Sequence, residues 1–442
     1  MKILSNFSGL KAYFIGIGGI SMSGLARILR ERGCVVLGSD IGRDNPEIDK
    51  LRRDGIRVFG EHLALNLDQD VDFVVYTSAI KDDNPEIIRA RSLGIPCFER
   101  AEMLGMVARA YDKVIAVSGT HGKTTTTTLI GEIFTLAELN PTIHIGGVSV
   151  GLKDSTIIGD NDYLILEACE YCNSFRFIAS DTAVVTNIES DHLDYYNDLQ
   201  EITDSFEYFA SRARSLVCNS SINFEHKEKC TIGDDWVAQD IIYKNDGYDF
   251  SVVYKGKFWG DVRLNIMGEY NITNALFAIA VADKYGIDKS TIIRAIFDFK
   301  GVERRCEKVA EINGMAVLID YAHHPTEISS TLQSLDIKYK NILVIFQPHT
   351  YTRTLSLFDD FIRAFDGREN LIIYDTYPAR EEVIIGGRAE DLVDAIEYAE
   401  YEYDMTRLIA RINNAYKSHF DLVLVLGAGN LAERLKSYYK KV

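Results

Sequence analysis

Short apolar runs recur along most of the chain, and each run ends at glycine or polar residues that precede an amphipathic stretch. Apolar runs without alternation are typical of strands buried on both faces of a parallel sheet, and the stretches between them have helical spacing. The pattern predicts an α/β fold in which strands and helices alternate. We expect strands at residues 13–17, 35–37, 73–76, 114–117, 163–166, 182–187, 316–319, 342–346, 371–374 and 422–426, and helices at 25–30, 84–93 and 100–112.

The pattern is weaker at residues 218–254, where polar and aromatic residues alternate without a motif, and there we expect only mixed strand and loop. A chain of 442 residues is too long for one hydrophobic core and suggests about three domains. After residue 315, polar clusters follow several predicted strands, as they do in doubly wound sheets that bind ligands at strand ends.

Composition excludes several classes of protein. A net charge of −17 argues against nonspecific binding of nucleic acid, which needs a basic surface. No apolar run reaches the length of a membrane span and the first residues lack signal-peptide features, so we expect a cytoplasmic protein that binds no membrane. Cys169 and Cys172 have the spacing of a redox or zinc pair, but no second pair follows, and we interpret the seven cysteines as reduced thiols.

The strongest chemical signal is Ser-Gly-Thr-His-Gly-Lys-Thr at residues 118–124, which follows a predicted strand and precedes helical spacing. Backbone N–H groups at a helix N-terminus bind phosphate, Lys123 can reach the outer phosphates, and the Thr124 hydroxyl can hold Mg²⁺. The general phosphate-loop pattern has four residues between its glycines, whereas only two separate Gly119 from Gly122. A glycine-rich turn before an ordinary helix is the alternative interpretation.

A second glycine-rich turn, at residues 16–21, follows the first predicted strand and is similar to a dinucleotide-binding turn. Ser21 stands where that pattern has its third glycine, and Asp40 lies near the place of an acid that meets a ribose hydroxyl. The turn admits NAD, FAD or a UDP-sugar, although such glycines also serve packing alone. Two nucleotide-type turns in one chain suggest an enzyme that joins or modifies something.

Further polar residues follow the predicted central strands. Glu167 comes after residues 163–166, where a carboxylate next to a phosphate loop can hold Mg²⁺, and a solvent-exposed acid is the alternative. Asp191 and His192 form a cluster suited to a metal or nucleotide site. Asn271 and Asn274 share a helical face and can hold adenine or ribose, although Asn271 could instead cap its helix.

Seven motifs in chain order resemble those of the Mur ligases, the ATP-dependent family that forms amide bonds on peptidoglycan precursors. They are Gly-Ile-Gly-Gly-x-x-Met-Ser-Gly, Gly-Ser-Asp, Gly-Thr-His-Gly-Lys-Thr-Thr-Thr-Thr, Asn-Ile-Glu-x-Asp-His-Leu-Asp, Asp-Tyr-Ala-His-His-Pro-Thr-Glu, Gln-Pro-His-Thr-Tyr-Thr-Arg-Thr and Tyr-Pro-Ala-Arg-Glu. The short phosphate loop is the family's own form. The resemblance runs nearly end to end and implies a Rossmann-like domain for a UDP-sugar (1–108), a central P-loop ATPase-like domain with a mixed sheet (109–301) and a Rossmann-like ligase domain (302–442).

The resemblance also implies an activity: ligation of L-alanine to the carboxylate of UDP-N-acetylmuramate, with ATP and Mg²⁺, by a monomer or homodimer. The implied catalytic residues are Lys123, Glu167, His192, His323 and Arg353. Thr124, Glu167 and His192 would hold the metal ion. Nucleotide contacts would come from Gly119, Thr120, His121, Gly122, Lys123, Thr124, Thr125, Asn271, Asn274, Arg305 and Asp320. The UDP-sugar would contact Gly16, Gly18, Gly19, Ser21, Ser39 and Asp40.

Three departures from the family pattern affect these expectations. Ser21 replaces a glycine, which we expect to tighten the steric demands of the first turn. Cys169 and Cys172 stand where many members have aspartates, which puts secondary metal contacts in question. Thr350 stands where other members carry arginine, so selection of the amino acid is expected to depend more on Arg353.

Other functions remain open from the sequence. A murein peptide ligase would add a whole peptide to the same sugar nucleotide. A nicotinamide-dependent oxidoreductase would use the first turn but would leave Lys123 and the C-terminal motifs unexplained. A binding subunit without catalysis would have no need of Lys123, Glu167 and His192.

Overall fold

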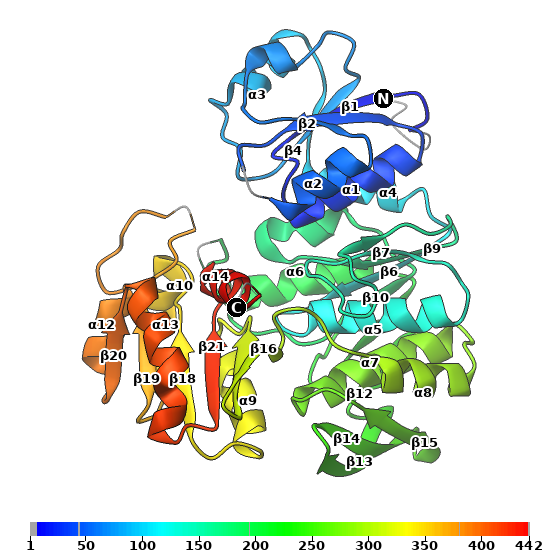
Figure 1. Cartoon of the computed structure of the whole chain (residues 1–442). Helices are drawn as coiled ribbons and strands as arrows, with labels where there is room; N and C mark the ends of the chain where they lie inside the picture. Colours follow the sequence, from blue (N-terminus) through cyan, green and yellow to red (C-terminus); the bar gives the residue numbers. More distant parts are fainter. Residues whose placement is uncertain (1–6, 43–44, 194, 380, 441–442) are drawn as a thin grey trace.

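The computed structural model describes residues 7–42, 45–193, 195–379 and 381–440, which form three sheets in chain order. The part with the first sheet, blue in Figure 1, lies at one end of the central part, and the part with the third sheet, yellow to red, lies beside the central part. Asp194 and Arg380, which belong to two of the sequence motifs, lie outside the described residues. Within the described ranges, no helix has both the length and the apolar character needed to span a membrane.

The first sheet is parallel throughout and has the strand order β3-β2-β1-β4-β5. This is the predicted Rossmann-like order, and the turn after β1 lies where the order of strands reverses, the usual place for a ligand. Strand β1 ends before the predicted residue 17 because Gly16 turns the chain with a φ of 79°. The elements are β1 (Lys11–Ile15), α1 (Ile20–Glu31), β2 (Val35–Ser39), α2 (Pro46–Arg53), β3 (Arg57–Phe59), η1 (Ala64–Asn66), β4 (Phe73–Tyr76), α3 (Pro85–Ser92), β5 (Cys97–Glu99) and α4 (Arg100–Ala108).

The second sheet is mixed and has ten strands, with β6 between β10 and β9 in its buried parallel part. The motif-free region contains the parallel strand β12 and then forms antiparallel strands at one edge of the sheet, where one face meets solvent and polar residues alternate with aromatic ones. The elements are β6 (Lys113–Ser118), α5 (Lys123–Leu136), β7 (Thr142–His144), β8 (Thr156–Ile157), β9 (Tyr163–Glu167), η2 (Tyr171–Phe177), β10 (Thr182–Val185), α6 (Leu199–Ser211), β11 (Ser215–Asn219), β12 (Lys229–Ile232), β13 (Trp236–Lys244), β14 (Gly247–Tyr254), β15 (Lys257–Leu264), α7 (Tyr270–Lys284) and α8 (Lys289–Asp298).

The third sheet has the order β16-β17-β21-β18-β19-β20 and is parallel except for β16 at its edge. Helices cover both of its faces, so its central strands are fully buried and apolar, as predicted. The elements are β16 (Glu307–Ile312), β17 (Met315–Asp320), α9 (Pro325–Asp336), β18 (Ile342–Phe346), α10 (Tyr351–Ser356), α11 (Phe358–Ala364), β19 (Leu371–Tyr374), α12 (Ala389–Ala395), β20 (Ala399–Glu402), α13 (Met405–Asn414), η3 (Ala415–Ser418), β21 (Leu422–Leu426) and α14 (Leu431–Tyr439).

The predicted fold class is therefore confirmed, whereas the predicted domain borders after residues 108 and 301 stay predictions. The chain passes from the first sheet to the second between α4 and β6. Its passage to the third sheet is less abrupt, because Val302 still forms an isolated antiparallel bridge with Ser149 of the central part.

Helix α1 packs closely against the central part at Gly24. A Cβ atom there would lie 2.1 Å from Thr156 Oγ1 and 2.8 Å from the ring of His144. Ser21 lies inside α1, and its hydroxyl is 2.9 Å from His144 Nε2. The close approach that requires a glycine falls at Gly24, and the expectation that Ser21 tightens the steric demands of the turn stays a prediction.

Candidate active site

The phosphate loop joins β6 to α5 through two glycines that have positive φ. Gly119 has a φ of 141°, and a Cβ atom there would lie 1.9 Å from Thr186 Oγ1. Gly122 has a φ of 81° and precedes the first residue of α5. The N–H groups of the first turn of α5 have no partner within the helix, so the loop has the form of an anion-binding N-terminus.

Lys123 is the first residue of α5, and its ammonium group folds back over the loop. Its Nζ donates to the carbonyl oxygens of Gly119 at 2.6 Å and Thr120 at 3.0 Å, and it pairs with Glu170 Oε1 at 2.9 Å. Burial alone would lower the pKa of Lys123, but the neighbouring acidic groups, of which Glu170 contributes most, together outweigh burial and raise it. His192 Nε2 lies 3.5 Å from the same oxygen of Glu170. The sequence analysis assigned no role to Glu170. Its position three residues after the end of β9 could have predicted that it lies near the phosphate loop.

The predicted metal ligands fall into two groups. Thr124 Oγ1 donates to Glu167 Oε2 at 2.9 Å, and the backbone N–H of Gly146 donates to the same oxygen at 2.8 Å. A hydroxyl and a carboxylate oxygen are donors of the kind that Mg²⁺ prefers, so these two residues fit the ion. His192 contacts Glu170 instead, and its role as a third ligand stays a prediction.

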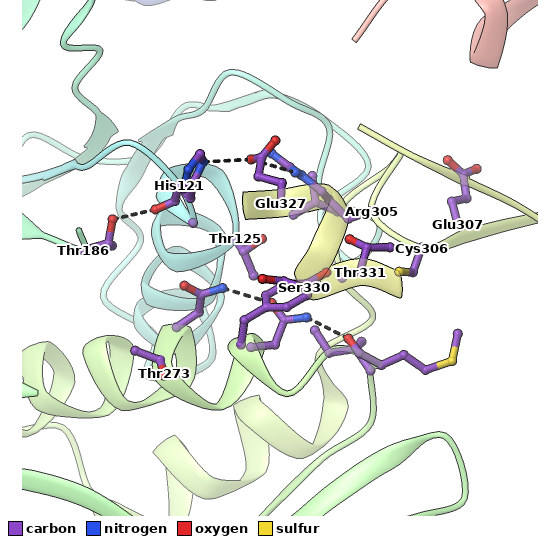
Figure 2. Close-up of a pocket in the computed structure, with 18 of the residues that line it drawn as sticks. His121, Thr125, Thr186, Thr273, Arg305, Cys306, Glu307, Glu327, Ser330 and Thr331 are labelled. Atoms are coloured by element: carbon purple, nitrogen blue, oxygen red, sulfur yellow. Dashed lines mark hydrogen bonds and ion pairs between the residues drawn. The ribbon is translucent and has the colours of Figure 1, made fainter. Parts of the chain in front are cut away.

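A cavity of about 570 Å³ opens beside the phosphate loop, between the central and C-terminal parts (Figure 2). The central part contributes His121 and Thr125, and the C-terminal part contributes Arg305, Glu327 and Ser330. Six of the residues predicted to contact a nucleotide line it: His121, Gly122, Thr125, Asn271, Asn274 and Arg305. The cavity therefore adjoins the phosphate loop, and its occupation by a nucleotide stays a prediction.

The two asparagines of α7 form one hydrogen-bonded pair in this cavity. Asn274 donates to Asn271 Oδ1 at 3.0 Å, and Asn271 donates to the carbonyl oxygen of Met267 at 2.8 Å. Asn271 lies inside α7, which begins at Tyr270, so the capping alternative is wrong. The carboxylate of Asp320 accepts the N–H group of Cys306, which lines the cavity, and that of Ala322.

Polar contacts join the central part to the C-terminal part around the loop. Asp191 accepts two hydrogen bonds from Arg353, at 3.1 and 3.0 Å, and both side chains are about nine-tenths buried. Glu189 accepts the Thr326 hydroxyl at 2.7 Å, and the ring of His121 lies 3.2 Å from Glu327. Because these pairs cross between parts, the phosphate loop is enclosed by residues from both.

Comparison with known proteins identifies the family. Three domain families match successive stretches: Mur ligase family, catalytic domain (residues 11–112), Mur ligase middle domain (117–282) and Mur ligase, glutamate ligase domain (304–429). A UDP-N-acetylmuramate–L-alanine ligase from Caldanaerobacter subterraneus is 41% identical over 96% of both chains. The chain belongs to the Mur ligase family. The enzyme of the same name from Caldicellulosiruptor saccharolyticus is also 41% identical, over 95% of this chain and 96% of that protein.

Solved structures agree with this assignment. The UDP-N-acetylmuramate–alanine ligase of Thermotoga maritima superposes with a TM-score of 0.82 at 27% identity, over 98% of this chain and 99% of that one. A murein peptide ligase from Psychrobacter arcticus has a TM-score of 0.73 at 23% identity, over 98% and 99% of the two chains, and shows the shared fold alone. The similarity thus extends over all three sheets of this Mur ligase.

The glycine turn of this Mur ligase's N-terminal part is held by the acid predicted to contact the UDP-sugar. Asp40 accepts the N–H group of Gly18 at 2.8 Å and that of Gly42. Gly19 precedes α1, so the turn leads directly into a helix N-terminus. The hydroxyl of Ser39 instead donates to the buried carboxylate of Glu86. Contact of these residues with a UDP-sugar stays a prediction.

The C-terminal part of this Mur ligase places His349 next to two predicted site residues, His323 and Arg353. His323 and His349 have ring centroids 6.0 Å apart, and Arg353 lies 3.3 Å from His349 Nδ1. Burial, together with the nearby positive charge of Arg353, lowers the pKa of His349 to about 3, so its ring is neutral. Thr350 precedes α10 as its N-cap with a φ of 67°, and its side chain accepts the backbone N–H of Arg353.

Alanine at Gly119 tests the geometry of the phosphate loop. The substitution is expected to cost roughly 2–4 kcal/mol of folding free energy, because the added Cβ would overlap Thr186 Oγ1 and because alanine disfavours a φ of 141°. Thermal unfolding measures the loss of stability, and ATP binding measures the effect on the phosphate loop. Gly60→Ala is the matched control, since its Cβ would meet no atom within 4 Å. Equal stability of the two variants would contradict the loop geometry.

The pKa of His121 predicts a pH dependence. Burial alone would lower this pKa, but the carboxylates of Glu327 and Glu189 outweigh burial and raise it to about 9. The pKa of an unfolded histidine is about 6.5. The ion pairs of His121 therefore contribute fully below pH 6.5, by roughly 2–3 kcal/mol, and this contribution is lost as the pH rises through about 9.

A comparison of the wild type with His121→Gln at several pH values measures this contribution. The difference in melting temperature is expected to be largest near pH 6.5 and smallest above pH 9. His226→Gln serves as the matched control, because the His226 ring bonds to backbone groups, the carbonyl oxygen of Ala213 and the N–H group of Glu228. A difference that grows with pH would refute the assignment of a protonated His121.

Proposed function

We propose that this Mur ligase joins L-alanine to the carboxylate of UDP-N-acetylmuramate with ATP, in the synthesis of peptidoglycan precursors. The observation that carries the proposal is the 41% identity, over 96% of both chains, to a relative of that named activity. The phosphate loop beside a cavity of about 570 Å³, bounded by two parts of the chain, supports it.

The first step joins the muramyl carboxylate to the γ-phosphorus of ATP, and ADP leaves with the electron pair of the broken bond. A carboxylate and a triphosphate repel each other, so cationic groups must offset their charge as the phosphoryl group moves. Lys123 is the cation at the loop, and Glu170 and the loop carbonyls hold it in place. Arg353, held by Asp191, adds a second cation on the side of the C-terminal part.

Mg²⁺ would be held by Thr124 and Glu167, which already contact each other, and when bound it would neutralise phosphate charge. If His192 is a third ligand, its Nε2 must leave its contact with Glu170 and bind the ion instead. The carboxylate of Glu170 would then keep Lys123 as its partner.

In the second step the amine of alanine attacks the acyl carbon, and phosphate leaves. The amine must lose a proton, and His323 is the proposed acceptor. Contacts between the central and C-terminal parts would exclude water, which would otherwise hydrolyse the acyl phosphate.

Addition of a peptide to the same sugar nucleotide is the second candidate, because a murein peptide ligase shares the fold. Formation of ADP from ATP and UDP-N-acetylmuramate should be measured with alanine, glycine, serine and a tripeptide as the amine. We expect alanine to give the highest kcat/KM. Preference for the tripeptide would replace the proposal, and a change in NADH absorbance with the UDP-sugar would favour an oxidoreductase.

The proposed setting is the cytoplasm, where the substrates are small molecules and the enzyme is a monomer or homodimer. The net charge of −17 fits the absence of nucleic-acid binding from this proposal. Light scattering of the purified protein with and without ATP would distinguish the monomer from the homodimer.

A further inference from the structure

Glu327 lies in the first turn of α9, and its two carboxylate oxygens face different partners. Oε1 lies 3.2 Å from Nδ1 of His121 in the phosphate loop and 3.6 Å from Arg305 (Figure 2). Oε2 lies 3.2 Å from Nδ1 of His323 and accepts the backbone N–H of His323 at 3.1 Å. The side chain is only 10% exposed. One buried carboxylate thus contacts the nucleotide loop on one side and the proposed amine base on the other.

These contacts determine which nitrogen of His323 carries hydrogen. Nδ1 lies 3.0 Å from the carbonyl oxygen of Tyr321 as well as 3.2 Å from Glu327 Oε2. Both oxygens are acceptors, so Nδ1 of the neutral ring is the donor and Nε2 keeps its lone pair. A carboxylate in this position also stabilises the imidazolium that forms when Nε2 takes a proton.

We propose that Glu327 is a positioning residue for the amine step, an inference that rests on the proposed function. The nitrogen of alanine forms a bond to the acyl carbon, the bond from that carbon to the phosphate oxygen breaks, and phosphate leaves with the electron pair. The proton of the attacking nitrogen passes to Nε2 of His323. Glu327 holds that ring in the accepting tautomer, and through His121 it ties the ring's position to the phosphate loop.

A purely structural role for Glu327 makes a different prediction, and hydroxylamine separates the two. Hydroxylamine is neutral at pH 7 and attacks acyl phosphates without a general base, giving a hydroxamate. If Glu327 acts through His323, Glu327→Gln should lower kcat with alanine about 100-fold. The same variant should form hydroxamate from saturating ATP and UDP-N-acetylmuramate at a rate within about threefold of the wild type.

Equal losses with alanine and hydroxylamine would overturn the inference, because Glu327 would then act on acyl-phosphate formation or on domain contacts. An unchanged rate with alanine would overturn it as well. Absence of ADP formation by the wild type with any amine would instead refute the proposed function, and so the two failures are distinguishable.

Three further variants distinguish a loss of function in Glu327→Gln from a loss of its folded structure. Glu327→Asp keeps the charge but retracts the carboxylate, so it should lose activity with alanine only, and by less than Glu327→Gln. In a His323→Ala background, Glu327→Gln should lower the alanine rate by less than about twofold, because its partner is already absent. Glu311→Gln, at an exposed acid that pairs with Lys308, should leave both reactions unchanged.

Discussion

Alanine at Lys123 is expected to lower the rate of ATP-dependent ligation by at least about a thousandfold. The Lys123 ammonium is held by two carbonyl oxygens and Glu170 at the loop that we propose binds the phosphates. A cation aimed at a transferring phosphoryl group contributes through electrostatic stabilisation, which is large in a site that excludes water. Single-turnover formation of ADP is the measurement, with UDP-N-acetylmuramate and ATP both saturating.

Stability complicates this experiment, because Lys123→Ala leaves the buried carboxylate of Glu170 without its cation. Breaking a buried ion pair by removing one partner costs roughly 3–5 kcal/mol. Burial alone would raise the pKa of Glu170, and the charges of Lys123 and His192 are what lower it. The double variant Lys123→Met with Glu170→Gln removes both charges and should recover most of the melting temperature without recovering activity.

Lys227→Ala is the control for the loss of a positive charge, because Lys227 is exposed. It should match the wild type in both stability and rate. Recovery of ligation in the uncharged double variant would show that the cation of the loop is dispensable, and the phosphate-loop assignment would fall.

The sequence was sufficient to predict the buried strands and the fold class. Strands β4, β18, β19 and β21 have the predicted bounds, because each is an apolar run with polar or glycine residues at its end. The edge strands β13 to β15 could not be delimited, since one of their faces meets solvent and polar residues interrupt the pattern. Their antiparallel pairing depends on turns that carry no distinctive motif.

Part of the candidate site was also predictable. A strand that leads into Gly-Lys-Thr predicts a phosphate loop by itself, and the end of β9 is adjacent to that loop in a parallel sheet. The pairing of Asp191 with Arg353, which are 162 residues apart, was not predictable, because it depends on how two sheets are placed relative to each other. The contact of Glu327 with His121 could not be predicted for the same reason, because the two residues belong to different parts of the chain.

Glutamine at Glu167 is expected to lower kcat by roughly 10²–10³-fold and to raise the Mg²⁺ concentration needed for half-maximal rate about tenfold. Glu167 Oε2 accepts hydrogen bonds from Thr124 and from the N–H of Gly146, so both lone pairs of that oxygen face donors. The amide of glutamine has no negative charge with which to bind a cation. If its NH₂ group replaced Oε2, it would face the Thr124 hydroxyl or the Gly146 N–H and could not accept a hydrogen bond from either. Removal of Mg²⁺ with a chelator should abolish ligation by the wild type.

A magnesium titration of the ligation rate distinguishes a metal ligand from a residue that only shapes the loop. A ligand predicts that excess Mg²⁺ partly restores the rate of Glu167→Gln, whereas the affinity for ATP without Mg²⁺ is unchanged. Glu207→Gln, at an exposed acid of α6, should titrate like the wild type. If Glu167→Gln instead lowers the rate with the same Mg²⁺ dependence as the wild type, Glu167 acts through its hydrogen bonds to Thr124 and Gly146, and the ion must be held by other residues.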